Sequence, residues 1–199
     1  MWHKSLHSVK TEHMPLVVDT YQELLENGFV EKVPDQEVFP DHPTYVMTSR
    51  PVFRLGKTTS KCRIVINASL PDQKDQNKSL NKLLMPGPNK LPQIMKLVLK
   101  TMMKEHLVLI DVKKMFLAIQ LSKASDKDML RFFWAKPGAT RPDLLRYRVL
   151  AFGVVSSPFR AIWCLHETAK MNMSKYPEAA QLILDMTYMD DISVTASDI

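Results

Sequence analysis

Three aspartates stand where the surrounding sequence suits metal-dependent chemistry. Asp111 ends the apolar run 107–110, and Asp190 and Asp191 follow one another directly behind Tyr188-Met189. Buried neighbouring carboxylates raise each other's pKa, and their mutual repulsion is costly in a low dielectric. A divalent cation offsets that cost, and hard oxygen ligands suit Mg²⁺. Two such ions commonly serve in-line phosphoryl transfer, so the three acids indicate phosphate chemistry. An exposed Asp-Asp turn in a hairpin is the plain alternative.

The elements that must position these acids alternate along the chain. Strands are predicted at 51–54, 63–67, 106–110, 130–134 and 145–150, and the 106–110 strand is expected to be buried. Helices are predicted over 17–27 (stopped by Gly28), 92–104, 157–173 (with Ser157 as cap and Pro158 at the first position), and after Pro177. Residues 34–51 read as loop or extended edge, residues 71–82 as loop, and residues 188–195 as two strands folded back at the acid pair. Strands and helices therefore interleave, which indicates an α+β or α/β fold.

The charge distribution favours a polyanionic partner. The net charge is +6, and from residue 54 to 104 only Asp72 and Asp75 oppose a run of basic residues: Arg54, Lys57, Lys61, Arg63, Lys74, Lys78, Lys82, Lys90, Lys96, Lys100 and Lys104. Lysines and arginines near phosphates release condensed counterions, which favours binding to nucleic acid. A solvated basic face gives the same pattern. Apolar residues make up 45% of the chain, which argues against wholesale disorder.

Two further features bear on where the protein works. Cys62 and Cys164 have no metal-ligand spacing and indicate a reduced intracellular protein. No apolar run is long enough to cross a bilayer, and the first residues do not form a secretory signal, so no membrane partner is expected.

Four segments resemble motifs of reverse transcriptases, and they follow one another in the family's order. Tyr188-Met-Asp-Asp191 resembles the family signature, and Asp111–Phe116 resembles the first palm motif. Residues 152–158 (Phe-Gly-Val-Val-Ser-Ser-Pro) resemble the second palm motif, and residues 61–69 resemble the fingers strand that contacts the triphosphate. The resemblance runs from about Tyr21 to Thr195.

Finer details resemble the BEL/Pao group of long-terminal-repeat retrotransposons. They are Ser79-Leu-Asn81, Pro86-Gly-Pro88, residues 111–120, Phe152-Gly153 and Ser157-Pro-Phe159. This resemblance implies a segment of a Pol polyprotein that acts in the cytoplasm or within virus-like particles of the element. It implies an RNA or DNA template with a primer strand, deoxynucleoside triphosphates, and the rest of the Pol polyprotein as partners.

The resemblance also implies roles for individual residues. Asp111 and Asp190 would hold two Mg²⁺ ions (Mn²⁺ as substitute) with the backbone carbonyl of Val112, and Asp191 would be a less direct ligand. Arg63, with Lys61 or Lys57, would neutralise the triphosphate. Phe116 would be the steric gate that excludes a ribose 2′-hydroxyl; a core aromatic is the alternative. Phe152 and Gly153 would shape the nucleotide floor, Met189 would approach the primer end, and Ser157 and Pro158 would begin the helix beneath the template.

The implied fold is an α+β right-hand polymerase fold with fingers and a partial palm. One truncated domain, 1–199, would comprise fingers at approximately 1–91 and 119–156 and a palm at approximately 92–118 and 157–199. The acids would lie on adjacent strands of a small antiparallel palm sheet, backed by the helices from Pro92 and Ser157.

Two features depart from the family pattern. Asn67 stands where aspartate is expected, and Ile199 follows shortly after the acid pair. The thumb and the RNase H, integrase and protease regions are therefore expected to be absent. Weak synthesis, an unpaired sheet edge and exposed apolar surface are the expected consequences.

Three functions compete at this point. The first is a polymerase segment housing the two-metal site, and the second is a non-catalytic relic or domesticated nucleic-acid-binding module. The third is an unrelated phosphotransferase, which needs a phosphate-cradling glycine loop. None of the five glycines forms such a loop.

Overall fold

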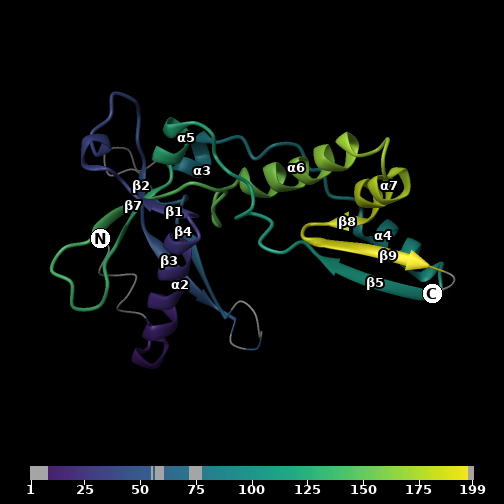
Figure 1. The fold of residues 1–199 in the computed structure, drawn as a ribbon, viewed down its shortest axis with the longest axis horizontal. Coiled ribbons are helices and arrows are strands. Elements are labelled where there is room, and N and C mark those ends of the chain that lie inside the picture. Colours follow the sequence, from purple (N-terminus) through teal and green to yellow (C-terminus); the bar gives the residue numbers. More distant parts are fainter. Residues whose placement is uncertain (1–8, 55, 57–60, 72–77, 197–199) are drawn as a thin grey trace. The chain divides into compact units, whose positions relative to one another are not determined.

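A computed structural model describes residues 9–54, 56, 61–71 and 78–196 (Figure 1). Helices and small sheets alternate along the chain, which confirms the α+β class. The chain forms two compact units: Met1–Met85 with Phe116–Ser157, and Pro86–Met115 with Pro158–Ile199. Lys57 and most of the turn predicted around it lie outside the described residues.

The first unit holds a four-stranded sheet and a separate hairpin. The sheet has the order β1 (Val30–Lys32), β7 (Asp143–Tyr147), β6 (Arg131–Trp134) and β2 (Val46–Met47), and only β2 pairs in parallel. The hairpin joins β3 (Ser49–Phe53) to β4 (Cys62–Ile66), as predicted. The remaining elements are η1 (Thr11–His13), α2 (Met14–Glu26), η2 (Asp35–Glu37), α3 (Leu80–Leu83) and α5 (Ala124–Asp128).

Helix α2 ends where the sequence predicts. Gly28 adopts a left-handed conformation at φ +67°, its N–H donates to Leu25, and the N–H of Phe29 donates to Leu24. This is a Schellman motif, in which a glycine closes the last turn without a steric penalty at Cβ. It turns the chain directly into β1.

An aromatic cluster fills the core of the first unit. Tyr21 of α2 stacks on Trp134 with ring centroids 3.7 Å apart, and Phe132 packs against both Tyr21 and Tyr147. The two tyrosine hydroxyls are satisfied inside the core, since Tyr21 bonds Ser49 at 2.7 Å and Tyr147 donates to the carbonyl of Ile64 at 3.2 Å. The cluster ties α2 to both the sheet and the hairpin.

A buried network of charged residues links α5 to β6 and β7 of this sheet. Asp128 is 1% exposed and accepts from Arg131 at 3.0 Å and from Arg146 at 2.7 Å, while His42 lies 2.8 Å away. Arg146 also pairs with Glu31 at 2.7 Å. Burial raises the pKa of Asp128, but the hydrogen bonds from Arg146, His42 and Arg131 outweigh burial and hold it below its usual value.

We expect Asp128→Asn to lower the free energy of unfolding by about 3 kcal/mol near pH 7, because the buried Arg131 loses its carboxylate partner and Arg146 loses one of its partners. The lowered pKa means that the ionised carboxylate stabilises the fold above the unfolded pKa of about 3.9, and that this stability is lost as the pH falls below it. Urea unfolding from pH 7 to pH 3 should therefore show the gap between wild type and variant shrinking. Asp126→Asn, on the exposed face of α5, is the matched control. A gap that stays constant down to pH 3 would contradict this account.

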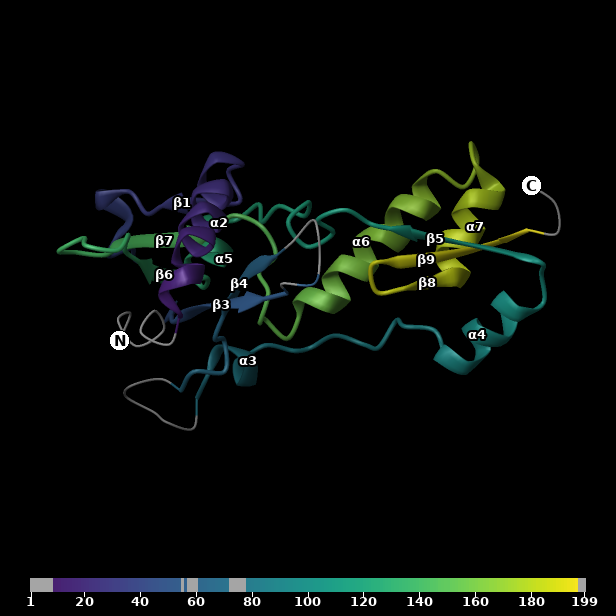
Figure 2. The same ribbon diagram turned by 90° about the horizontal axis from the view of Figure 1, so that it is seen from below.

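The second unit is built around a three-stranded antiparallel sheet. Its order is β5 (His106–Asp111), β9 (Asp191–Ala196) and β8 (Thr187–Tyr188), and the strands run side by side in Figures 1 and 2. The helices are α4 (Ile94–Met102), α6 (Ser157–Met171) and α7 (Pro177–Met186). Helices α4 and α7 pack closest to the sheet, α4 on β9 and α7 on β8 and β9. The sequence predicts all three helices but assigns this backing to α4 and α6.

The predicted burial of β5 is wrong. Every residue of β5 is exposed, and Leu107, Val108, Leu109 and Ile110 keep 47–64% of their surface open. The strand lies at the edge of the described sheet, and α4 and α7 pack on its neighbours. The expected apolar sheet edge is therefore present.

Other differences are local. A short helix, α3, begins inside the segment predicted as loop, because Ser79 caps it by accepting from the N–H of Lys82. The β8–β9 turn comprises Met189 and Asp190, one residue earlier than predicted, and Asp191 already belongs to β9. No helix in the described ranges is long and apolar enough to cross a membrane.

Candidate metal and nucleotide sites

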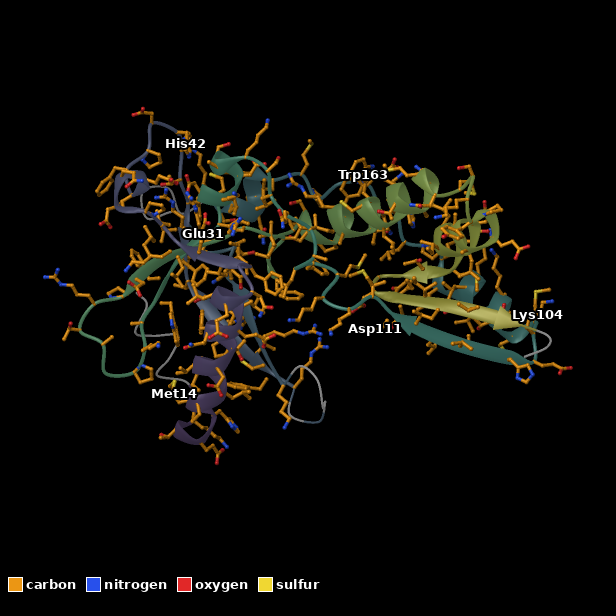
Figure 3. The ribbon with its side chains drawn as sticks, viewed as in Figure 1. Met14, Glu31, His42, Lys104, Asp111 and Trp163 are labelled. Atoms are coloured by element: carbon orange, nitrogen blue, oxygen red, sulfur yellow. The ribbon has the colours of Figure 1, made fainter. Side chains whose placement is uncertain are left out.

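The sheet of the second unit brings the predicted acids to one end. Asp111 and Asp191 are cross-strand partners at the end of the β5–β9 ladder, and Asp190 lies in the adjoining turn. The N–H of Val112 donates to the backbone carbonyl of Asp190 at 2.8 Å, which fixes the turn against the chain leaving β5. Figure 3 shows Asp111 at the end of β5 nearest this turn, opposite the end that follows Lys104.

We call Asp111, Asp190 and Asp191, together with the turn between β8 and β9, the acid turn. The β8–β9 turn and the loop that follows β5 each contain a residue with a strained backbone conformation. Lys114 has φ 54° and Met189 has φ 58°, and among the described residues they are the non-glycine residues with positive φ. Two-residue hairpin turns with a positive φ at the first position favour glycine, so Met189 stands there at a conformational cost. Strain of this kind gathers at functional sites, where the surrounding structure holds it in place.

The acid turn suits hard divalent cations by its chemistry. Asp111 and Asp191 are exposed and Asp190 is half-buried, so the acids are not buried together as the sequence argument assumed. The strand register sets Asp111 opposite Asp191, and like charges directly opposite one another are destabilising unless a cation lies between them. Within the described ranges, no three acids, histidines or cysteines form a ready-made metal cage. The donors on offer are the carboxylates of two cross-strand partners and of the residue next to one of them, and Mg²⁺ prefers carboxylate oxygens.

The backbone carbonyl of Val112 is the fourth metal ligand that the resemblance implies. Its carbonyl accepts from the N–H of Met115 at 3.2 Å in the turn that follows β5. A carbonyl has two acceptor sites, so one remains for a cation. The role that the resemblance gives this carbonyl is compatible with its hydrogen bonding.

A second cluster of predicted residues lies in the first unit, and we call Arg63, Phe116 and Phe152 the aromatic shelf. The Arg63 guanidinium lies 5.4 Å from the centroid of the Phe152 ring, and Phe116 packs on the same ring at 5.1 Å with a 33° tilt. An arginine over an aromatic face gains a cation–π attraction and keeps its donors available. All three side chains are half-buried, so the shelf is not sealed into the core.

Gly153 anchors this shelf to β4. The N–H of Ile66 donates to the carbonyl of Phe152 at 3.0 Å, so the two backbones touch. Gly153 has φ +103°, and a Cβ there would lie 2.0 Å from the carbonyl oxygen of Ile66. Glycine is required here both for its conformation and for this approach.

The other predicted residues have simpler settings. Lys61 is exposed next to the start of β4, and Pro158 is half-buried at the start of α6. Ser157 is 2% exposed and its hydroxyl donates to the carbonyl of Ala151 at 2.9 Å, so it braces the helix start instead of capping it. Sequence reasoning gave Asn81 no role beyond the Ser79-Leu-Asn81 pattern, yet its side chain bonds to the turn that carries Gly153.

Comparison with protein families decides the assignment that these clusters suggest. The family described as reverse transcriptase (RNA-dependent DNA polymerase) matches residues 55–199. The chain belongs to the reverse transcriptase family. The match includes Arg63, all three acids and the shelf residues. No curated protein matches this reverse transcriptase chain.

Family membership gives the coarse chemistry. The activity of the family is RNA-directed DNA polymerisation, which implies a nucleic-acid template and nucleotide substrates, and its members generally use divalent metal ions. These statements hold for the family that this reverse transcriptase chain belongs to. The role of each residue in this chain is a separate question.

Proposed function

We propose that this reverse transcriptase chain catalyses Mg²⁺-dependent addition of deoxynucleotides to a primer, with Asp111, Asp190 and Asp191 as its metal-binding acids. The observation that carries the proposal is the strand register. It sets Asp111 opposite Asp191 and joins the Asp190 turn to Val112 by a backbone hydrogen bond. A register of this kind fixes the backbone positions of the aspartates through the hydrogen bonds of the strand ladder.

In this proposal the residues of the chain position the metal ions and the substrates and supply charge. Bound Mg²⁺ ions would stabilise the attacking and leaving oxygens of an in-line displacement. Asp111 and Asp190 hold the ions, Asp191 supports them, and the Val112 carbonyl offers a further oxygen. Phosphoryl transfer needs little covalent help from protein, so the main contributions are positioning and charge.

The aromatic shelf supplies the nucleotide-binding part of the proposal. Arg63 neutralises the triphosphate by charge-assisted hydrogen bonds, and Lys61 adds charge nearby. Phe152 and Gly153 form the nucleotide floor, and Phe116 excludes a ribose 2′-hydroxyl. The contact of Arg63 and Phe116 with the same Phe152 ring supports assigning them to one binding surface. Met189 approaches the primer end, while Ser157 and Pro158 set the helix start beneath the template.

The finer classification is also a proposal. The Ser79-Leu-Asn81 and Pro86-Gly-Pro88 patterns support a BEL/Pao-type retroelement and, with it, a Pol polyprotein in virus-like particles. We propose that the first unit corresponds to the fingers and the second to the palm of a right-hand polymerase. The placement of the acid turn within the second unit supports this correspondence.

A nucleic-acid-binding module without catalysis is the second candidate. The exposed acids, with no ready-made metal cage among the described residues, favour it, as does the basic run from Arg54 to Lys104. Such a module would bind nucleic acid with a strong salt dependence and would not extend a primer.

Single-nucleotide primer extension separates the two candidates. The chain is incubated with an RNA template, a DNA primer and one complementary deoxynucleotide, with Mg²⁺ or with EDTA, and binding is measured in parallel over a salt series. The polymerase predicts a product that needs Mg²⁺. Salt-dependent binding of the nucleic acid with no extended primer in Mg²⁺ or Mn²⁺ would contradict the polymerase proposal and support the nucleic-acid-binding module.

A further inference from the structure

Asn81 lies at a junction of three backbone segments in the first unit. Its side-chain NH₂ donates to the carbonyl of Gly153 and to the hydroxyl of Ser69, each at 3.0 Å, and its side-chain oxygen accepts from the N–H of Val155 at 2.8 Å. Its own backbone N–H donates to the carbonyl of Ala68 at 2.9 Å. One residue at the start of α3 therefore holds both the segment that follows β4 and the glycine turn.

This junction is connected to the aromatic shelf through the Phe152–Gly153 turn. Phe152 directly precedes Gly153, and its ring is the surface on which Arg63 and Phe116 meet. On one side the turn is bonded to β4 through Ile66. On the other side Asn81 holds Gly153 and Val155, so the turn cannot shift without breaking these bonds.

Only an amide of this length can make all three side-chain bonds. Aspartate has the same shape and can accept from Val155, but it has no hydrogen to donate to the carbonyl of Gly153. Two oxygens would then face one another. Leucine has a comparable volume and makes none of the three bonds.

We propose that Asn81 is a positioning residue for nucleotide binding, which acts by clamping the Phe152–Gly153 turn beneath the substrate. The proposal rests on the proposed function of the aromatic shelf. Asn81 need not touch the nucleotide. Its loss lets the turn relax, so the affinity for deoxynucleotide falls while the acid turn of the other unit keeps its own hydrogen bonds.

The test compares Asn81→Asp and Asn81→Leu with wild type in the full chain. Single-nucleotide extension gives kcat and KM for dTTP, and equilibrium dialysis gives dTTP binding without turnover. Thermal unfolding of each variant is recorded in parallel. Asn27→Asp is the matched control, because the Asn27 amide also donates to a backbone carbonyl, that of Glu23, from an exposed position in the same unit.

We expect KM and the dissociation constant for dTTP to rise about tenfold in both Asn81 variants, with kcat changing by less than about twofold, as for the loss of one or two hydrogen bonds. Asn27→Asp should change neither. A dissociation constant for dTTP within about twofold of wild type would overturn the inference. This holds also if kcat and thermal stability fall while dTTP binding is unchanged.

The two readouts also separate this inference from the proposed function. Absence of extension by wild type contradicts the proposed polymerase, and the dialysis arm then decides the role of Asn81 by itself. Wild type that binds no dTTP would overturn both.

Discussion

Replacing Asp190 by alanine abolishes Mg²⁺-dependent primer extension, with an expected fall in rate of about a thousandfold or more. The substitution removes the carboxylate alone. The backbone carbonyl of residue 190 still accepts from Val112, so the turn and the β5–β9 register should survive. The loss would thus report on the metal ligand and leave the fold in place. The measurement is single-turnover incorporation of one deoxynucleotide, with circular dichroism as the folding check.

Asp185→Ala is the matched control for this loss. Asp185 is an exposed acid of α7 in the same unit, and it pairs with Lys100 at 3.9 Å, well outside the acid turn. We expect its variant to incorporate nucleotide at the wild-type rate. Incorporation near the wild-type rate by Asp190→Ala, or an equal loss in both variants, would remove Asp190 from the site.

Gly153→Ala is expected to lower both stability and nucleotide binding. The new Cβ would lie 2.0 Å from the carbonyl oxygen of Ile66, a backbone atom that cannot swing aside, and φ +103° is strained for alanine. Conformation alone costs roughly 1–2 kcal/mol, and the clash adds to this. We expect a loss of at least about 2 kcal/mol in the free energy of unfolding, measured in urea. Nucleotide binding should weaken as well, because Phe152 moves with the turn.

Gly138→Ala separates the clash from the backbone strain. Gly138, in the β6–β7 loop, also has a positive φ of +83°, but a Cβ there meets no atom within 4 Å. Its variant should lose roughly 1–2 kcal/mol at most. Equal losses at the two glycines would show that the close approach of residue 153 to β4 carries no energetic weight.

Local sequence signals predicted most of the elements, since local chemistry decides them. Gly28 ends α2 because a left-handed residue closes the helix, and Pro177 begins α7 because proline suits a first turn. The apolar run 107–110 predicted β5 correctly. Its burial could not be predicted from periodicity, because burial depends on what packs against the strand, and α4 and α7 pack on the neighbouring strands.

The candidate site was also predicted only in part from the sequence. Residue types and order led to Asp111 and the Asp190–Asp191 pair, and the register then set Asp111 opposite Asp191. The metal argument assumed that the acids are buried, but Asp111 and Asp191 are exposed. Ser157 was predicted as a cap from its place before proline, but its hydroxyl donates to the carbonyl of Ala151, at the other end of the glycine turn that precedes the helix.

Asn81 illustrates what a single sequence omits. Its three side-chain partners lie at residues 69, 153 and 155, and two of these are more than seventy positions away. No local pattern gives such a spacing, and an asparagine after leucine has many other uses. The role becomes visible only when the hydrogen bonds of a folded chain are known.

The central claim is that the acid turn binds divalent cations, and Mn²⁺ titration followed by electron paramagnetic resonance tests it without requiring turnover. The comparison is between wild type, Asp111→Asn, Asp191→Asn and the control Asp185→Asn. We predict that wild type and the Asp185 variant bind Mn²⁺ with the same affinity. The Asp111 and Asp191 variants should bind at least about tenfold more weakly, because each loses one of the facing carboxylates. Equal Mn²⁺ binding by all four chains would contradict the account.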